Sequence, residues 1–319
     1  MVHKTILFCI CCITIIYSPA YPAGFSNYNQ DATAVAMGDS FTSIANNSSA
    51  VFYNPAGINQ LEGTKLRSGL MLYYPNTSFR NAESGERTDI YDDIAFLSSG
   101  YLTHKVNDKI SIGGGIFSPF GLATEWPNHW QGRTLSIYAS MKTFCFNPVV
   151  SIQIHPRLSL AVGIDYLYAD FKIRRGIDPN QMIGLPLGIP QGKVTLDGDD
   201  GAWGFNLGLL FHINDRWTLG VAYRSKYKLK FDGKAKYQLP RVLQPLFPST
   251  DISPRMELPQ MLSTEISVKI LENWIVAMGV LWTNWSVFDE LAPNFENDFL
   301  IPSSMQTVPQ DWNDVFAFH

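Results

Sequence analysis

The chain has 319 residues, of which 46% are hydrophobic, 13% aromatic and only 16% charged. The charged fraction is below the roughly 25% typical of soluble domains, and the mean hydropathy of −0.02 argues against a bundle of membrane-spanning helices. The net charge of −4 argues against nucleic acid as a partner. The composition therefore fits a large core or a membrane-facing surface.

Residues 1–20 have the pattern of a secretory signal peptide and not of a folded element. A basic start at Lys4 precedes the apolar run Ile6–Tyr17, and small residues end the leader at Ala20. The run is shorter than the ~20 apolar residues that a membrane-spanning helix needs. Cleavage after Ala23 and a short membrane anchor are the alternatives.

Three of the four cysteines, Cys9, Cys11 and Cys12, lie in this leader, so the exported chain keeps only Cys145. A single thiol cannot form an internal disulfide, and zinc or thiol chemistry would lack a second cysteine. The histidines show no metal-ligand spacing. We expect neither a metal nor another cofactor.

Residues 44–58 do not have the pattern of a strand or of a separate domain. Asn, Gly and Pro interrupt the stretch, yet Ala50–Tyr53 is apolar and has to be buried somewhere. We therefore predict that residues 21–63 form a plug, or hatch, inside the structure built by residues 64–319.

The later segments alternate between bulky apolar residues and small or polar ones. From Trp217 to Phe231 most odd positions are apolar, whereas even positions such as Gly220 and Lys228 are small or basic. Residues 144–154 and 158–169 alternate in the same way. A period of two indicates strands with two different faces, here one long strand over 217–231. Bulky residues outside and small residues inside are typical of a barrel wall in lipid.

Four tight connections recur, marked by Asp108, Pro156, Asp215 and Asn273. Each gap between them holds an outgoing strand, a long loop and a returning strand, so the short turns all lie at one end. Outer-membrane barrels have short periplasmic turns and long extracellular loops. About ten antiparallel strands are predicted, near residues 64–80, 92–106, 109–118, 136–155, 157–175, 193–213, 216–238, 256–271, 274–288 and 306–318.

The last predicted strand stops at His319 without a closing turn. An unclosed sheet in lipid would leave a row of unpaired backbone groups, each costing several kcal/mol. We therefore expect the sequence to be a C-terminally truncated form of a longer barrel.

Three motifs stand out: Asn54-Pro55-Ala56 in the plug, the glycine-rich segment 113–121, and Trp282–Ser286. They resemble the FadL family of outer-membrane long-chain fatty acid transporters, which includes aromatic-hydrocarbon uptake channels. The resemblance implies a barrel of about fourteen strands with an N-terminal hatch. It also implies that a ligand is captured outside, passes through the lumen as the hatch rearranges, and leaves sideways beside a kinked third strand.

The resemblance assigns the gate to Asn54, Pro55 and Ala56. The asparagine side chain can bond to backbone groups and the proline fixes a turn. The alternative is a generic turn.

The kink and the lateral exit are expected at Gly113, Gly114, Gly115 and Pro119. Glycines remove the side chains that pack against neighbouring strands, and proline cannot donate to a ladder. The alternative is a small-residue face that fits the plug. Apolar residues of the same strand and loop are proposed to capture the ligand: Phe117, Phe120, Leu122, Trp126 and Trp130. Ordinary loop packing, or a lipid-facing girdle, is the alternative for each.

A carboxylate ligand would need a basic partner inside the wall. Arg224 and Lys226 are the candidates, because they share the small-residue face of a strand away from its tip. The alternative is a solvated charge without a ligand.

The sequence thus predicts a passive channel for hydrophobic compounds, with long-chain fatty acids as the favoured ligand and aromatic hydrocarbons as the alternative. Outer-membrane lipid and lipopolysaccharide are the expected surroundings, and the chain is expected to be a monomer. Two alternatives belong to other classes. A lipase-like enzyme would need a catalytic triad that the residues do not supply, and a structural barrel would need no hatch.

Overall fold

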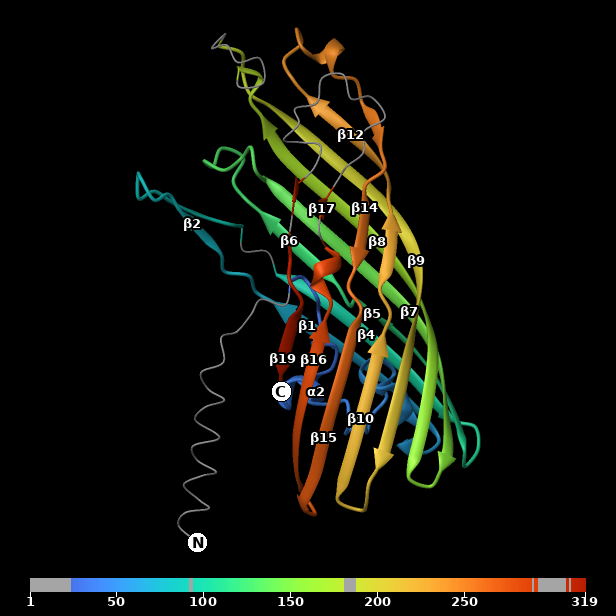
Figure 1. The fold of residues 1–319 in the computed structure, drawn as a ribbon. Coiled ribbons are helices and arrows are strands. Elements are labelled where there is room, and N and C mark those ends of the chain that lie inside the picture. The colour runs from blue at the N-terminus through green and yellow to red at the C-terminus, as the bar shows by residue number, and fades with distance from the viewer. Residues whose placement is uncertain (1–23, 92–93, 181–187, 289, 292–307, 310) are drawn as a thin grey trace.

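The computed structural model describes residues 24–91, 94–180, 188–288, 290–291, 308–309 and 311–319. The predicted signal peptide lies outside these residues. Figure 1 shows that a tall, curved sheet dominates the described part. No helix in these ranges is both long and apolar enough to cross a membrane.

Ten strands follow one another along the main antiparallel path of the sheet, which confirms the predicted number. In spatial order they are β1 (Thr64–Tyr73), β4 (Ala95–Lys105), β5 (Ile110–Phe117), β7 (Tyr138–His155), β8 (Leu158–Ile177), β9 (Gly192–His212), β10 (Trp217–Arg224), β15 (Met261–Leu271), β16 (Trp274–Thr283) and β19 (Val315–Phe318).

Shorter strands extend the upper parts of this sheet or form separate hairpins. They are β2 (Ser78–Arg80), β3 (Arg87–Asp89), β6 (Gly121–Glu125), β11 (Tyr227–Lys230), β12 (Asp232–Gln238), β13 (Thr250–Ile252), β14 (Arg255–Leu258), β17 (Glu290–Leu291) and β18 (Val308–Pro309). The predicted strand 256–271 is thus two strands, β14 and β15. The predicted strand 274–288 ends at Thr283, and a 3₁₀ turn, η3 (Trp285–Val287), follows it.

The four predicted turns join the hairpins β4–β5, β7–β8, β9–β10 and β15–β16, and all lie at the lower end in Figure 1. The longer connections lie at the upper end. This arrangement confirms a wall built from hairpins with long tips.

The predicted alternation along β7 is also confirmed. Phe144 and Phe146 are 52% and 55% exposed on the outer face, whereas Cys145 and Asn147 are fully buried on the inner face. Bulky residues therefore face outward and small or polar residues face the concave side.

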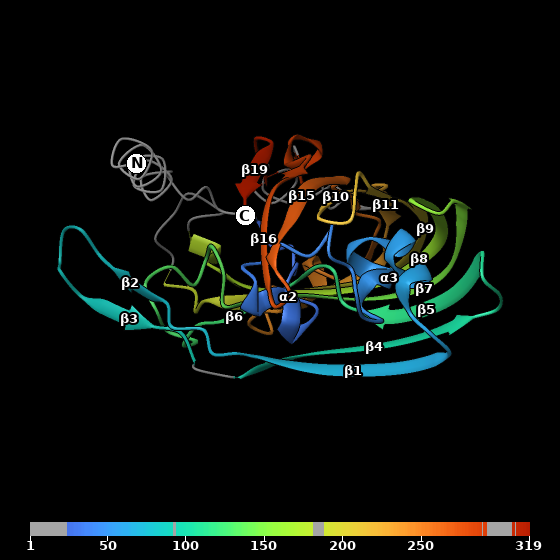
Figure 2. The same ribbon diagram turned by 90° about the horizontal axis from the view of Figure 1, so that it is seen from below.

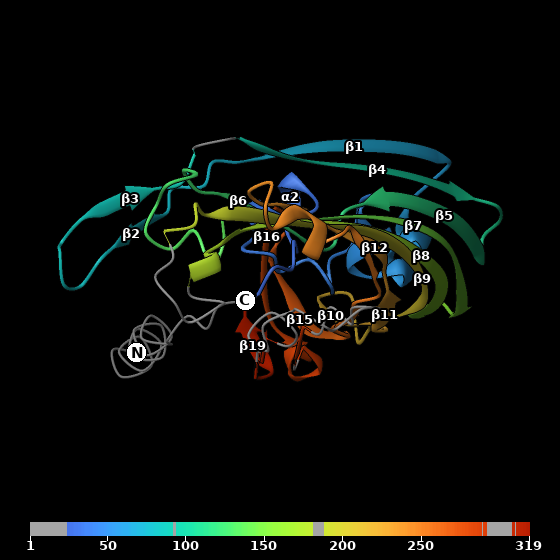
Figure 3. The ribbon, with the colours of Figure 1, turned by 90° about the horizontal axis from the view of Figure 1, so that it is seen from above.

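The concave side of the sheet holds the N-terminal segment, defined here as residues 24–63. Figures 2 and 3 show this segment inside the arc, seen along the strands from below and from above. It contains two short helices and a 3₁₀ helix: α2 (Ala32–Ala36), α3 (Ala50–Tyr53) and η1 (Pro55–Gln60). All four residues of α3 are buried, as the sequence predicts.

One predicted strand is wrong in an informative way. The strand expected over 217–231 is divided into β10 and β11, and β11 leaves the main sheet to pair with β14. Arg224 and Ser225 are consecutive residues, yet both are buried, so the alternation reverses between them. Odd residues face outward in β10, but Tyr227 and Leu229 are buried on the inner side. A one-residue shift in register moves every following side chain to the other face.

Candidate functional site

Asn54 joins the N-terminal segment to the wall. Its side-chain amide donates to the carbonyl oxygens of Thr42 (2.8 Å) and Leu209 (2.9 Å), and its Oδ1 accepts from the Ala56 N–H (3.2 Å). The residue is fully buried. Pro55 follows at the start of η1, where its missing N–H costs nothing. The motif thus ties a turn of the segment directly to β9.

A buried carboxylate makes a second connection to the wall. Glu265 on β15 is 2% exposed and accepts from the Thr42 N–H (3.2 Å), the Ser43 N–H (2.9 Å) and the Ser43 hydroxyl (2.6 Å). The hydroxyls of Thr42 and Ser263 lie 2.7 Å apart. One buried side chain thus holds both backbone N–H groups and a hydroxyl of residues 42–43.

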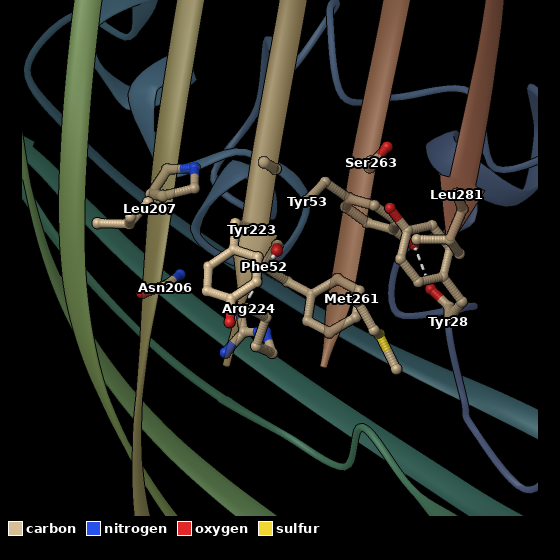
Figure 4. Close-up of a pocket in the computed structure, with 12 residues that line it drawn as sticks. Tyr28, Phe52, Tyr53, Asn206, Leu207, Tyr223, Arg224, Met261, Ser263 and Leu281 are labelled. Atoms are coloured by element: carbon tan, nitrogen blue, oxygen red, sulfur yellow. Dashed lines mark hydrogen bonds between the residues drawn. The ribbon is translucent and has the colours of Figure 1, made fainter. Parts of the chain in front are cut away.

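A buried ion pair forms a third connection. The Arg224 guanidinium is 2.6 Å from Asp165 Oδ2 and also donates to the Phe52 carbonyl at 3.4 Å (Figure 4). Its central carbon lies 5.3 Å and 5.1 Å from the ring centroids of Phe52 and Phe117. The Tyr227 hydroxyl donates to the same Asp165 oxygen. The predicted carboxylate binder therefore already has a carboxylate partner from the wall.

Two wall glycines let the segment approach closely. A Cβ on Gly208 would lie 2.5 Å from Asn54 Oδ1, and a Cβ on Gly220 would lie 2.3 Å from the Thr42 carbonyl oxygen. Any larger residue at either position would push the segment off the wall.

Gly113 and Gly115 serve the same purpose on β5. An added Cβ would lie 3.1 Å from Val51 at either position, whereas one on Gly114 would meet only a backbone oxygen at 3.9 Å. The β5–β7 register runs without a shift through all three glycines. The register has no bulge at these glycines, and the closeness of Gly113 and Gly115 to Val51 favours the alternative interpretation, a small-residue face that fits the plug.

The wall is interrupted a few residues later, around Pro119. Phe117 pairs with Cys145 and Gly121 pairs with Lys142. The chain therefore advances four residues between β5 and β6 while the partner strand β7 advances three. On the other side, β4 pairs with β5 only over Gly100–Lys105. Among the described residues, Ala95–Ser99 of β4 therefore pair with β1 but have no strand partner on the edge where Pro119 lies.

The start of the N-terminal segment lies against this interruption. The Asn27 N–H donates to the Pro119 carbonyl (2.7 Å), and the Gly121 N–H donates to the Phe25 carbonyl (2.9 Å). Ser26 lies opposite Phe120 in an isolated antiparallel bridge. Besides these backbone bonds, the buried Phe25 ring packs on Phe120, Trp285 and Phe288.

Tyr53 links the two halves of the segment. Its hydroxyl donates to the Tyr28 carbonyl (2.9 Å) and accepts from the Gln30 N–H (2.9 Å) (Figure 4). Burial raises the pKa of Tyr53 well above its ordinary value, so the phenol stays neutral. A small cavity of about 20 Å³ lies beside it, between the segment and strands β9, β10, β15 and β16.

A larger cavity of about 130 Å³ lies between the wall and residues that follow β11. Its lining is almost entirely apolar and includes Phe25, Leu122, Phe171, Phe231 and Met256. Arg175 on β8 is the charged residue in the lining. The Nε of Arg175 is buried and has no hydrogen-bond partner among the described residues.

The five residues predicted to capture the ligand lie in three different places. Leu122 lines the larger cavity. Phe117 and Phe120 are fully buried and pack on aromatic rings of the N-terminal segment, so they are not on the outer surface. Trp126 and Trp130 stack on each other with ring centroids 4.2 Å apart, in the loop after β6.

Lys226, the second predicted carboxylate binder, lies outside the buried site. It is 2.7 Å from Glu257, and its side chain is 38% exposed. The reversal of alternation after Arg224 separates the two residues, because an uninterrupted strand would have placed both on one face.

A family model described as outer membrane protein transport protein (OMPP1/FadL/TodX) matches residues 13–319. The chain belongs to this family. It is an outer-membrane transporter of hydrophobic compounds. The long-chain fatty acid transport protein of Salmonella typhi is 24% identical over 305 residues, which cover 88% of this chain and 70% of that protein.

Solved structures of this OMPP1/FadL/TodX family have the same fold. A Pseudomonas aeruginosa FadL homologue matches with a TM-score of 0.74 at 18% identity, covering 93% of this chain and 76% of its own. The toluene transporter TodX of P. putida matches with a TM-score of 0.61 at 15% identity, covering 89% and 77%. The Salmonella typhi relative is named for long-chain fatty acids and TodX for toluene, so the similarity does not choose between these ligands.

Sequence reasoning missed Glu265 and Asp165, and it considered Arg175 as a carboxylate binder but preferred Arg224 and Lys226. Glu265 lies between Ser263 and Ser267 on the small-residue face of its strand, and Asp165 interrupts a similar face of β8. A lone acid on an inward face was the available signal, because a charge buried in a wall needs a partner. Arg175 gave no such signal, since nothing in the sequence shows that it lines a cavity.

Proposed function

We propose that the protein takes up long-chain fatty acids passively, with the long-loop end facing outside. The observation that carries the proposal is the apolar cavity of about 130 Å³ with Arg175 in its wall. A guanidinium with a free donor next to apolar surface suits a carboxylate with an acyl tail. Burial of the tail supplies affinity, at ~25 cal/mol per Å² of apolar surface.

Arg175 is a better head-group partner than the two residues predicted from the sequence. The Arg224 guanidinium already contacts Asp165, and Lys226 already contacts Glu257. A ligand carboxylate would have to displace those partners. At Arg175 it would instead satisfy a buried Nε that has no partner among the described residues.

Uptake of an aromatic hydrocarbon is the second candidate, and the size of the cavity favours it. At about 130 Å³ the cavity is close to the ~150 Å³ of a dry cavity known to bind benzene. A single ring would fill it, whereas an acyl chain would extend beyond it. An uncharged ring would leave Arg175 without a role.

Binding assays with three ligands separate these candidates. Arg175→Leu should weaken oleate binding by about tenfold, as expected for one charge-assisted contact. The same change should leave oleyl alcohol and toluene unaffected, because neither carries a carboxylate. Equal loss of oleate and oleyl alcohol, or tight toluene binding with no oleate binding, would refute the fatty acid assignment.

We further propose that residues 25–27 open the route to the interruption at Pro119. Phe25 lines the cavity, and its carbonyl bonds to Gly121 at the interruption. Release of these backbone bonds, together with the ring contacts of Phe25, would connect the cavity to the side of the wall. On this proposal Asn54 is an anchor of the hatch and not the moving gate, since its three bonds are all buried.

Two disulfide variants test this mechanism in a Cys145→Ser background. Ser26 and Phe120 face each other in an antiparallel bridge, a geometry that suits a disulfide. Oxidised Ser26→Cys/Phe120→Cys should block uptake of labelled oleate, and reduction should restore it. Thr42→Cys/Ser263→Cys, which replaces hydroxyls 2.7 Å apart, should transport equally when oxidised or reduced. Normal uptake by the first oxidised variant would exclude this exit.

A further inference from the structure

The outer face of the wall changes character where β10 gives way to β11. Below this level Tyr223 belongs to the outward, lipid-facing set. Above it Lys228 and Lys230 are exposed, while Tyr227 and Leu229 are buried on the inner side. The reversed alternation thus replaces aromatic residues by cations on one continuous surface.

This change lies at the height expected for the outer membrane boundary. Trp217 at the short-turn end is 41% exposed and Trp203 on β9 is 71% exposed. Arg224 pairs with Asn206, so Trp203 lies three residues above that pair. The two tryptophans are about ten residues, or ~33 Å, apart along the strands, and ~25 Å apart vertically at a tilt of about 40°. That distance matches the ~25 Å apolar band between aromatic girdles.

The side chains of two cations above this boundary form no ion pair among the described residues. Lys230 and Arg255 lie directly opposite each other in the β11–β14 ladder, and both are exposed. Like charges in this position repel, and neither residue forms an ion pair within the described part of the chain. Lys226 and Lys228 share one carboxylate, Glu257, at 2.7 and 3.4 Å. The Asp200 carboxylate accepts from the Lys230 backbone N–H at 2.6 Å, so the charges without an ion-pair partner among the described residues are those of the Lys230 and Arg255 side chains.

We propose that Lys228, Lys230 and Arg255 bind a phosphate of an outer-leaflet lipid, the phosphorylated lipid A of lipopolysaccharide. Its acyl chains would lie below, against Trp203 and Tyr166, whose ring centroids are 4.9 Å apart. Charge and position both favour this occupant. An amphiphile with an anionic head above apolar chains fits a cationic patch directly above an aromatic belt, whereas a soluble anion would use only the cations.

This lipid site is separate from the transport route. Leu229 and Met256 occupy the inner face of the same ladder, and Met256 lines the ligand cavity. The three cations point to the opposite face. Changes to them should therefore leave oleate uptake intact, so failure of the lipid proposal would not affect the proposed transport function.

The test is native mass spectrometry of the full chain in detergent micelles, titrated with diphosphorylated lipid A. Lys230→Ala/Arg255→Ala should bind at least about tenfold more weakly than the unchanged protein. Lys109→Ala/Arg216→Ala removes the same charge from exposed positions at the short-turn end, and its binding should be unchanged. Lys230→Arg/Arg255→Lys keeps the charge and should bind normally.

Three results would overturn the assignment. They are equal loss of binding in both alanine variants, undiminished binding of dephosphorylated lipid A, and complete displacement of lipid A by inorganic phosphate. The first would show a non-specific charge effect, the second binding through acyl chains alone, and the third a site for a soluble anion.

Discussion

Replacing Glu265 by Gln tests whether a buried carboxylate fixes the N-terminal segment. Glu265 accepts three hydrogen bonds from residues 42–43 and is 2% exposed. The amide has nearly the same shape, but its NH₂ group cannot accept, so at least one N–H of the segment loses its partner. Leaving a buried donor unsatisfied costs about 1–3 kcal/mol.

The measurement is hydrogen exchange at the amides of Thr42 and Ser43 in detergent-solubilised protein. A loss of about 1–3 kcal/mol corresponds to an exchange rate about 5–150-fold faster. The control is Glu62→Gln, because the Glu62 side chain is 78% exposed and pairs with Lys105 at the surface. Unchanged exchange in Glu265→Gln would show that the wall glycines and Asn54 hold the segment without the carboxylate.

Three further changes have defined outcomes. Gly115→Val should displace α3, because even a Cβ would lie 2.9 Å from Tyr101 and 3.1 Å from Val51; protease cleavage within residues 44–58 should increase, whereas Gly114→Ala should resemble the wild type. Arg224→Met should destabilise the protein by about 3–5 kcal/mol in urea unfolding, since Asp165 is left buried without its cation and keeps only the Tyr227 hydroxyl, and Arg224→Met/Asp165→Asn should recover most of that loss. Trp126→Ala/Trp130→Ala should slow oleate uptake at low concentration if the stacked pair captures ligand, and unchanged rates would limit it to loop packing.

The strands and the short turns could be predicted from the sequence because they depend on local chemistry. A strand with one lipid-facing side has to alternate, and a tight hairpin needs turn residues such as Asn and Asp. The burial of Ala50–Tyr53 could be predicted because this stretch is apolar yet flanked by turn residues. Each of these inferences uses only neighbouring positions.

The contacts of the candidate site could not be predicted, because they join distant positions. Glu265 is more than 200 residues from Ser43, to which it bonds, and Arg224 is 59 residues from Asp165. Gly115 and Pro119 illustrate the same limit at short range. Both are plausible kink residues by type, but only the register shows that the wall continues past the first and is interrupted at the second.

The sequence of residues 217–231 predicts one strand with all its apolar side chains on one face. The reversal at Arg224–Ser225 explains why the structure has them on two different faces. Period two shows that a strand has two faces but not which face is inside. Below the reversal the apolar residues face lipid, as at Trp217. Above it the apolar residues face inward, and Phe231 lines the larger cavity. One extra buried residue thus lets a single alternating sequence build two different apolar surfaces. In β10 the apolar side chains face the lipid, and in β11 they face the interior above the membrane. A transporter of hydrophobic compounds needs both surfaces.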